Sequence, residues 1–134
     1  MNERNKTINV VAAIVIKDGR VFASQRGYGE WKGWWEFPGG KIEPSEKPQD
    51  ALMREIREEL ATEIEVGDLL TVIEYDYPKF HLTMYCFLCT IIGGQYTLLE
   101  HKDACWLTSE ELDSVKWLPA DLGILSLIAE RLRV

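Results

Sequence analysis

Residues 80–92 constrain the fold more than any other stretch of the sequence, because they are apolar on both faces of an expected strand. Side chains alternate between the two faces of a strand. Apolar residues occupy both faces: Leu82, Met84, Cys86 and Leu88 on one, and Tyr85, Phe87 and Ile91 on the other. Such a strand has to be covered on both sides. The stretch therefore predicts a sheet packed between two other layers.

The first part of the chain predicts a hairpin followed by a loop. Residues 8–16 are β-branched and apolar, which indicates a buried strand. The Asp18-Gly19 pair is typical of a tight hairpin turn, and residues 21–26 form the returning strand. Residues 27–36 are expected to be a loop.

The remainder predicts helices interleaved with strands. Residues 48–60 begin with proline and contain good helix formers. Residues 64–77 read as a long strand, residues 96–100 and 104–107 as short ones, and residues 119–133 as a final helix. The inward face of that helix is expected to carry Leu122, Leu125, Ile128, Ala129 and Leu132. We expect an α/β chain, with a mixed sheet between helices, an α/β/α sandwich that forms a single domain over residues 1–134.

The charge and the apolar runs exclude some functions. The formal net charge is −7 over 134 residues, which suits binding to a nucleic-acid polymer poorly. A phosphorylated small molecule can still bind if a divalent cation bridges the like charges. The longest apolar run, residues 10–16, is too short for a bilayer, and the first six residues lack a signal-peptide core. We therefore expect a cytoplasmic protein with no membrane partner.

The three cysteines, Cys86, Cys89 and Cys105, favour packing over chemistry. Cys86 and Cys89 have the C-x-x-C spacing of a zinc or redox pair. Positions three apart on a strand, however, face opposite sides of the sheet. No second pair completes a zinc site in the sequence. We interpret all three as reduced packing residues.

The expected helix gathers carboxylates beside its apolar face. At 100° per residue, Glu55, Glu58 and Glu59 share an arc of about 100°, and the adjoining arc carries Leu52, Ile56 and Leu60. Like charges at the border of a core repel, so something has to compensate. Oxygen clusters of this kind suit Mg²⁺ or Mn²⁺. The alternative is a solvated acidic face that neighbouring arginines balance.

A longer motif around this helix resembles the Nudix box, in which glycine, glutamate and an R-E-x-x-E-E segment recur at fixed spacing. The fixed positions that match are Gly40, Glu46, Arg54, Glu55, Glu58 and Glu59. The match ends at Ala61, where the family has a glycine that closes the helix in a left-handed conformation, and at Thr62, where it has an aliphatic residue. Alanine in that conformation costs roughly 1 kcal/mol, or else the helix ends differently.

The resemblance extends over nearly the whole chain. Arg26 precedes a loop that ends at residues 35–40, as in MutT-type members of the family. Glu100 matches the position of an extra acidic metal ligand, and Asp121 that of a base-reading side chain. Residues 99–121 look most like the CTP pyrophosphohydrolase branch.

The resemblance implies the Nudix fold and the hydrolysis of a nucleoside triphosphate to a monophosphate and pyrophosphate. It assigns Mg²⁺, with Mn²⁺ as an alternative, to the Gly39 carbonyl, Glu55, Glu58, Glu59 and Glu100. Arg54 would orient these glutamates, and Glu46 would do the same or bind a further metal ion. The general base stays open among Glu55, Glu59 and Glu100.

Each candidate for a substrate contact also has an alternative role. Arg26 and Lys41 are candidates for phosphate binding or are solvated cations. Phe37 packs on the base or in the core, and Trp34 and Trp35 stack on the base or cover the sheet. Asp121 accepts from a cytosine amino group or a guanine-like edge, or else caps the last helix. His81 and His101 lack a carboxylate partner that the sequence reveals, which indicates structural roles.

Three functions stay open. The first is a pyrophosphohydrolase for CTP, dCTP, or a modified or oxidised nucleotide. The second is a hydrolase of another nucleoside diphosphate derivative, and the third is a non-catalytic nucleotide-binding module. The retained glutamates favour catalysis. A monomer and a homodimer are both compatible with the sequence.

Overall fold

The structure is a computed structural model that describes residues 6–93, 95–99 and 101–133, so the expected ligand Glu100 lies outside the described residues. Its elements in chain order are β1 Thr7–Lys17, β2 Arg20–Arg26, β3 Trp35–Glu36, β4 Gly39–Lys41, α1 Pro48–Leu60, β5 Glu63–Tyr77, β6 Phe80–Ile92, β7 His101–Leu107, the 3₁₀ helices η2 Ser109–Ser114 and η3 Pro119–Ile124, and α2 Leu125–Leu132. None of the described helices is both long and apolar enough to cross a bilayer.

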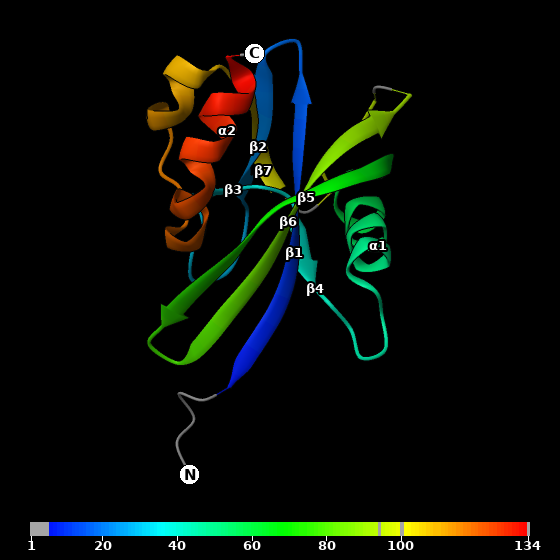
Figure 1. Cartoon of the computed structure of the whole chain (residues 1–134), viewed down its shortest axis with the longest axis vertical. Coiled ribbons are helices and arrows are strands. Elements are labelled where there is room, and N and C mark those ends of the chain that lie inside the picture. The colour runs from blue at the N-terminus through cyan, green and yellow to red at the C-terminus, as the bar shows by residue number, and fades with distance from the viewer. Residues whose placement is uncertain (1–5, 94, 100, 134) are drawn as a thin grey trace.

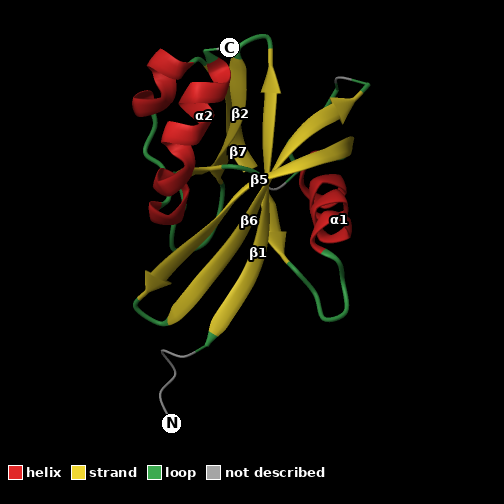
Figure 2. Cartoon of the chain, in the orientation of Figure 1, coloured by secondary structure: helices red, strands yellow, loops and turns green. Residues whose placement is uncertain are grey.

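The strands form one mixed sheet with helices on both sides. The main order is β3-β2-β1-β6-β5, with β4 added to β1 and β7 added to β2. The β1–β6 pair is parallel and the other strand pairs are antiparallel. Figures 1 and 2 show α1 on one side of the sheet and α2 on the other. The predicted α/β architecture is confirmed.

Two apolar cores lie on opposite faces of the sheet, as the composition of residues 80–92 predicts. The core on the α2 side includes Ile14 and Cys86, and the core on the α1 side includes Ala13 and Cys89. Cys86 and Cys89 therefore do face opposite sides. Burial raises the pKa of each of these two thiols to about 12, which keeps them protonated near neutral pH.

Several expected boundaries need correction. Residues 95–98 have no regular structure, whereas β7 begins at His101 because its pairing with β2 continues to Arg26. Residues 35–36 of the expected loop form β3. The expected helix over residues 119–133 begins as the 3₁₀ helix η3, whose tighter turn rotates Leu122 outward to 56% exposure.

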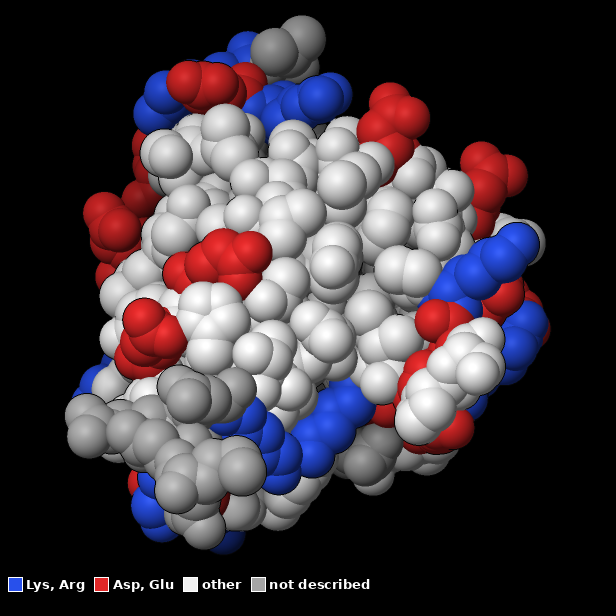
Figure 3. All heavy atoms as spheres, turned by 60° about the horizontal axis from the view of Figure 1, so that its bottom comes forward, with Lys and Arg blue, Asp and Glu red and all other residues white. Residues whose placement is uncertain are grey.

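Charged groups are interspersed around the margin of the surface in Figure 3, and uncharged residues fill much of its middle. The net negative charge is therefore not spread evenly over this face. In Figure 1, α1 lies to one side of β4, which pairs with β1. Glu55 of α1 lies against Gly40 of β4.

Candidate active site

Helix α1 presents its three glutamates at the border of a core. Leu52, Ile56 and Leu60 are at most 1% exposed and fix the inward face of the helix. Glu59 is itself buried, at 7% exposure, whereas the side chain of Glu55 is 18% exposed and that of Glu58 is 49% exposed. The exposure of the carboxylates thus increases from Glu59 through Glu55 to Glu58.

Two glycines of β4 allow close packing, Gly39 against β1 and Gly40 against Glu55 of α1. Gly39 and Gly40 pair with Ala12 and Val11 of β1. A Cβ atom on Gly39 would lie 1.9 Å from the backbone oxygen of Val11, and one on Gly40 would lie 2.3 Å from Oε2 of Glu55. Close packing, rather than an unusual backbone angle, therefore requires glycine at both positions.

Arg54 ties the glutamates to the loop before the helix. Its Nε and Nη2 donate to Glu46 at 2.8 and 2.9 Å, and Nη2 also donates to the Lys41 carbonyl at 3.0 Å. Nη1 lies 3.2 Å from Glu58 and 3.4 Å from Glu55. Hydrogen bonds from Arg54, and one from the Glu43 backbone, lower the pKa of Glu46 to about 2. Four motif residues therefore form one connected network: Glu46, Arg54, Glu55 and Glu58.

The helix ends as the family pattern predicts despite its alanine. Ala61 adopts the left-handed conformation, with φ 51° and ψ 40°, and its N–H donates to the Arg57 carbonyl at 3.1 Å. Thr62 is buried, and its hydroxyl donates to the Gln95 carbonyl at 2.5 Å. Thr62 stands where the family has an aliphatic residue, and its buried hydroxyl is thus hydrogen-bonded to a neighbouring loop.

A cavity of about 480 Å³ opens above the glutamates. Its lining includes Gly39, Lys41 and the three glutamates of α1. Among the described residues, no three His, Cys, Asp or Glu side chains lie close enough together to form a metal site. Arg54, which contacts both Glu55 and Glu58, holds these two carboxylates. The donors nevertheless suit a divalent cation, since the three glutamates of α1 line the cavity.

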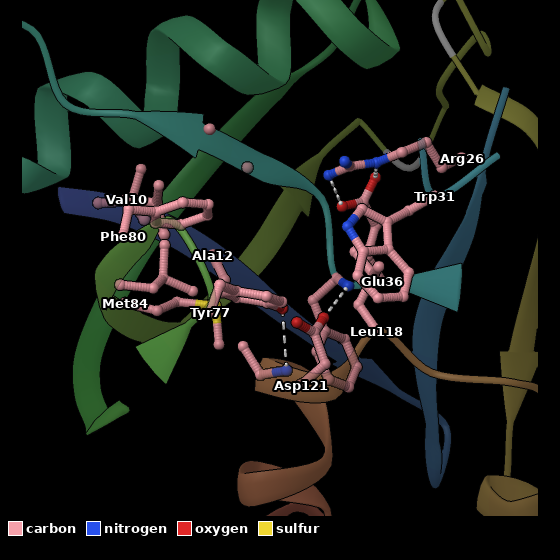
Figure 4. Close-up of a pocket in the computed structure, with 16 residues that line it drawn as sticks. Val10, Ala12, Arg26, Trp31, Glu36, Tyr77, Phe80, Met84, Leu118 and Asp121 are labelled. Atoms are coloured by element: carbon pink, nitrogen blue, oxygen red, sulfur yellow. Dashed lines mark hydrogen bonds and ion pairs between the residues drawn. The ribbon is translucent and has the colours of Figure 1, made fainter. Parts of the chain in front are cut away.

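A smaller cavity of about 170 Å³ adjoins the first, and the two share seven of the described residues in their linings: Val10, Arg26, Glu36, Gly39, Gly40, Phe80 and Leu82. Arg26 binds Glu36 through two hydrogen bonds, of 2.6 and 3.2 Å. Figure 4 shows this ion pair at one end of the smaller cavity, with Asp121 below it. A ligand can therefore extend from one cavity into the other.

Asp121 lies on η3 and lines the smaller cavity. Its Oδ2 accepts a hydrogen bond from the Phe37 backbone at 2.9 Å, so its carboxyl group contacts another segment and does not serve as a helix cap. Burial raises the pKa of Asp121 to about 8, against the opposing effect of the Phe37 N–H. The group is therefore mostly protonated at neutral pH.

The aromatic side chains expected to contact the base differ in whether they line a cavity. Phe37 is 4% exposed and stacks on Trp117 in the core with ring centroids 4.6 Å apart, yet it also lines the smaller cavity. Trp35 lies in β3 and is not among the residues that line either cavity. Trp31 and Tyr77 line the smaller cavity instead. The sequence motif does not include them.

His81 does have carboxylate partners, contrary to the expectation from sequence. It contacts Glu74 at 2.7 Å and Asp76 at 2.5 Å across the β5–β6 pair. These contacts raise the pKa of His81, Asp76 contributing most. His81 alternates with Phe80 and Leu82, which face the cavities, so the cluster lies on the other face of the sheet.

Comparisons with known proteins assign the class of protein. The NUDIX domain family matches residues 6–127. The chain therefore belongs to the Nudix family, whose members are hydrolases that generally act with a divalent metal ion.

Individual relatives agree with this assignment. The chain is 35% identical over 121 residues to the CTP pyrophosphohydrolase of Escherichia coli (strain K12), with 90% of each chain covered. It is 36% identical over 102 residues to the 8-oxo-dGTP diphosphatase of Proteus vulgaris, covering 75% of this chain and 89% of the relative. The solution structure of the E. coli ORF135 protein superposes with a TM-score of 0.81 at 33% identity, covering 95% and 92% of the two chains. Hydrolysis of pyrophosphate bonds in nucleotides is therefore its class of activity.

Proposed function

We propose that this chain hydrolyses a (deoxy)nucleoside triphosphate to the monophosphate and pyrophosphate with Mg²⁺, and that the base is cytosine or a modified or oxidised base. The main support is the continuity of the two cavities. The larger is lined by the glutamates of α1, and the smaller contains Asp121. With a divalent cation on the glutamates, the larger cavity suits a triphosphate, and the polar end of the smaller cavity suits a base.

The acidic half is assigned to the metal and the phosphates. Glu55, Glu58, Glu59 and the Gly39 carbonyl would hold Mg²⁺, which neutralises phosphate charge and lowers the pKa of bound water. Arg54 would release Glu55 and Glu58 toward the cation while it keeps its two bonds to Glu46. Lys41 and Arg26 line the same cavity and would contact phosphate oxygens.

The polar end of the smaller cavity is assigned to the base. A protonated Asp121 offers one donor and one acceptor. Cytosine presents the complementary N4 donor and N3 acceptor, and a guanine-type base presents the N1 donor and O6 acceptor. Relatives named for CTP and for 8-oxo-dGTP cover both bases.

A nucleotide panel tests the proposal. CTP, dCTP, 5-methyl-dCTP, 8-oxo-dGTP, ATP, a nucleoside diphosphate sugar and a dinucleotide polyphosphate are each incubated with Mg²⁺, and pyrophosphate and phosphate are measured separately. We expect pyrophosphate release from one of the first four and its loss in EDTA. Preference for either diphosphate derivative would contradict the triphosphate assignment, and binding without turnover would indicate a binding module.

Replacing Arg54 by Ala is expected to lower kcat about 10-fold to 100-fold, the usual cost of losing a group that orients metal ligands. Thermal unfolding is measured beside kcat, because Arg54 also makes a bidentate pair with Glu46 and a bond to the Lys41 carbonyl, and its loss should cost some stability. Arg57→Ala is the matched control, because Arg57 is on the same helix and pairs with Glu63 away from the cavity lining. Equal kcat values for the two variants, measured at saturating Mg²⁺, would refute the orienting role.

Asp121→Asn is expected to change how stability depends on pH. The folded pKa of about 8 exceeds the ordinary value of 3.8. The folded state therefore binds the extra proton between these values, and stability falls as pH rises from about 4 to 8. Asparagine keeps an acceptor for the Phe37 N–H and removes this loss. Urea unfolding at pH 5 and pH 8 should show a relative gain for the variant on the order of a few kcal/mol at the higher pH; parallel curves would contradict it.

A further inference from the structure

The loop between β2 and β3 is fixed at its base and presents Trp31 to the smaller cavity. The Gly33 N–H donates to the Arg26 carbonyl, and the Arg26 N–H donates to the Trp34 carbonyl, each at 2.8 Å. The Lys116 ammonium lies 4.1 Å from the ring centre of Trp34. The Trp31 ring packs against Trp34 with centroids 4.8 Å apart. The half-buried Trp31 is therefore positioned by its neighbours although it lies in a loop.

The opposite wall of the cavity is also aromatic. Tyr77 and Phe80, at the two ends of the β5–β6 turn, stack with centroids 5.1 Å apart and both line the cavity. The Tyr77 hydroxyl accepts a hydrogen bond of 3.2 Å from the Ala120 N–H. This bond ties the aromatic wall to η3, directly beside Asp121.

The two walls meet at Trp31 and Tyr77. Their ring centroids are 6.1 Å apart, with an interplanar angle of 64°. Figure 4 shows Trp31 near the Arg26–Glu36 pair, Phe80 on the far side of the pocket, and Asp121 and Tyr77 toward its lower edge. Aromatic rings thus border the pocket beside Asp121 and the Arg26–Glu36 pair.

We propose that Trp31 is a substrate-binding residue that covers the substrate base by stacking, while Tyr77 fixes the opposing wall. This inference rests on the proposed function, because it assigns the base to the smaller cavity. Stacking uses the flat face of the base and is largely insensitive to its edge. Trp31 accordingly supplies affinity for any planar base, whereas Asp121 reads the edge.

Trp31 should affect KM, whereas the glutamates of α1 should affect kcat. Stacking contributes to substrate and transition state alike, so its loss raises KM and leaves kcat nearly unchanged. Truncation of a base-stacking aromatic typically weakens binding on the order of 10-fold to 100-fold. A substrate without a base should be indifferent to the change.

Three variants and two substrates test the inference. Trp31→Ala removes the ring, Trp31→Leu keeps an apolar side chain without an aromatic face, and Lys32→Ala is the loop control, since Lys32 is exposed and lines neither cavity. Each is assayed with the preferred nucleotide of the panel and with ribose 5-triphosphate. We expect KM for the nucleotide to rise about 10-fold to 100-fold in both Trp31 variants only, with KM for ribose 5-triphosphate unchanged.

An unchanged KM for the nucleotide, or an equal rise for ribose 5-triphosphate, would overturn the role of Trp31 and leave the proposed function standing. Calorimetric titration with the nucleoside monophosphate gives a second reading that does not depend on turnover. We expect the Trp31 variants to bind it more weakly than the wild type and Lys32→Ala to match the wild type. If the wild type cleaves no triphosphate, the proposed function fails in the panel, and equal monophosphate binding by all variants would overturn the inference separately.

Discussion

Replacing Glu59 by Gln is expected to lower kcat by at least about 100-fold, the scale on which losing one group that stabilises transition-state charge reduces catalysis. Glu59 is the most buried of the three glutamates of α1 and lines the larger cavity. Glutamine has nearly the same shape but carries no charge, so the metal would lose a ligand of full charge. Removing one of several like charges should leave the fold intact or slightly more stable.

The matched control is Glu63→Gln. Glu63 is exposed, pairs with Arg57 at 2.6 Å and is absent from the lining of the larger cavity. Its kcat should stay within about twofold of the wild type, since exposed pairs of this kind contribute little. Initial rates of pyrophosphate release at saturating Mg²⁺, with thermal unfolding as the fold check, decide the comparison. A Glu59→Gln enzyme with kcat near that of the control would contradict the assignment.

The second large effect is expected from replacing Gly39 or Gly40 by Ala. The added methyl group would contact different atoms at the two positions. In Gly40→Ala the new Cβ would lie 2.3 Å from Oε2 of Glu55, the end of a flexible side chain. The carboxylate can move, so we expect a stability loss of about 1–3 kcal/mol. The displaced carboxylate would no longer face the cavity correctly, and kcat should fall about 10-fold to 100-fold.

Gly39→Ala should reduce stability more than Gly40→Ala does, without a specific effect on Glu55. Its Cβ would lie 1.9 Å from the backbone oxygen of Val11, which the β1–β6 pairing holds in place. The β4–β1 pairing has to open, and we expect a loss of more than about 3 kcal/mol or failure to fold. Urea unfolding and kcat measured side by side test the contrast. If both variants lost activity in proportion to stability, Gly40 would have no specific relation to Glu55.

The sequence predicted the elements whose pattern is local. The bounds of β6 and α1 agree with residues 80–92 and 48–60, because alternating faces and a proline start are signals within one segment. The 3₁₀ helix at residues 119–124 was missed, since its outward Leu122 depends on how η3 packs on β5. The partners of His81 were missed because they belong to the neighbouring strand, and cross-strand register is not visible in one segment.

The site residues also fall into two groups: those that a local motif predicts, and those that only the fold brings together. The network of Arg54 with Glu46, Glu55 and Glu58 follows from the motif, because its members lie on one helix and the loop before it. The smaller cavity joins a loop, a hairpin turn and a 3₁₀ helix that are far apart in the chain. Trp31 and Tyr77 therefore carried no signal in the sequence, and the protonation of Asp121 depends on burial that only the folded chain creates.

The central claim is that a divalent cation binds the three glutamates of α1, whose like charges otherwise repel each other. Replacing Glu55, Glu58 and Glu59 together by Gln, with Mn²⁺ binding followed by electron paramagnetic resonance beside pyrophosphate release, tests it directly. We expect the wild type to bind the cation and cleave its nucleotide, and the folded triple variant to do neither. Undiminished Mn²⁺ affinity and nucleotide cleavage in the triple variant would contradict the account.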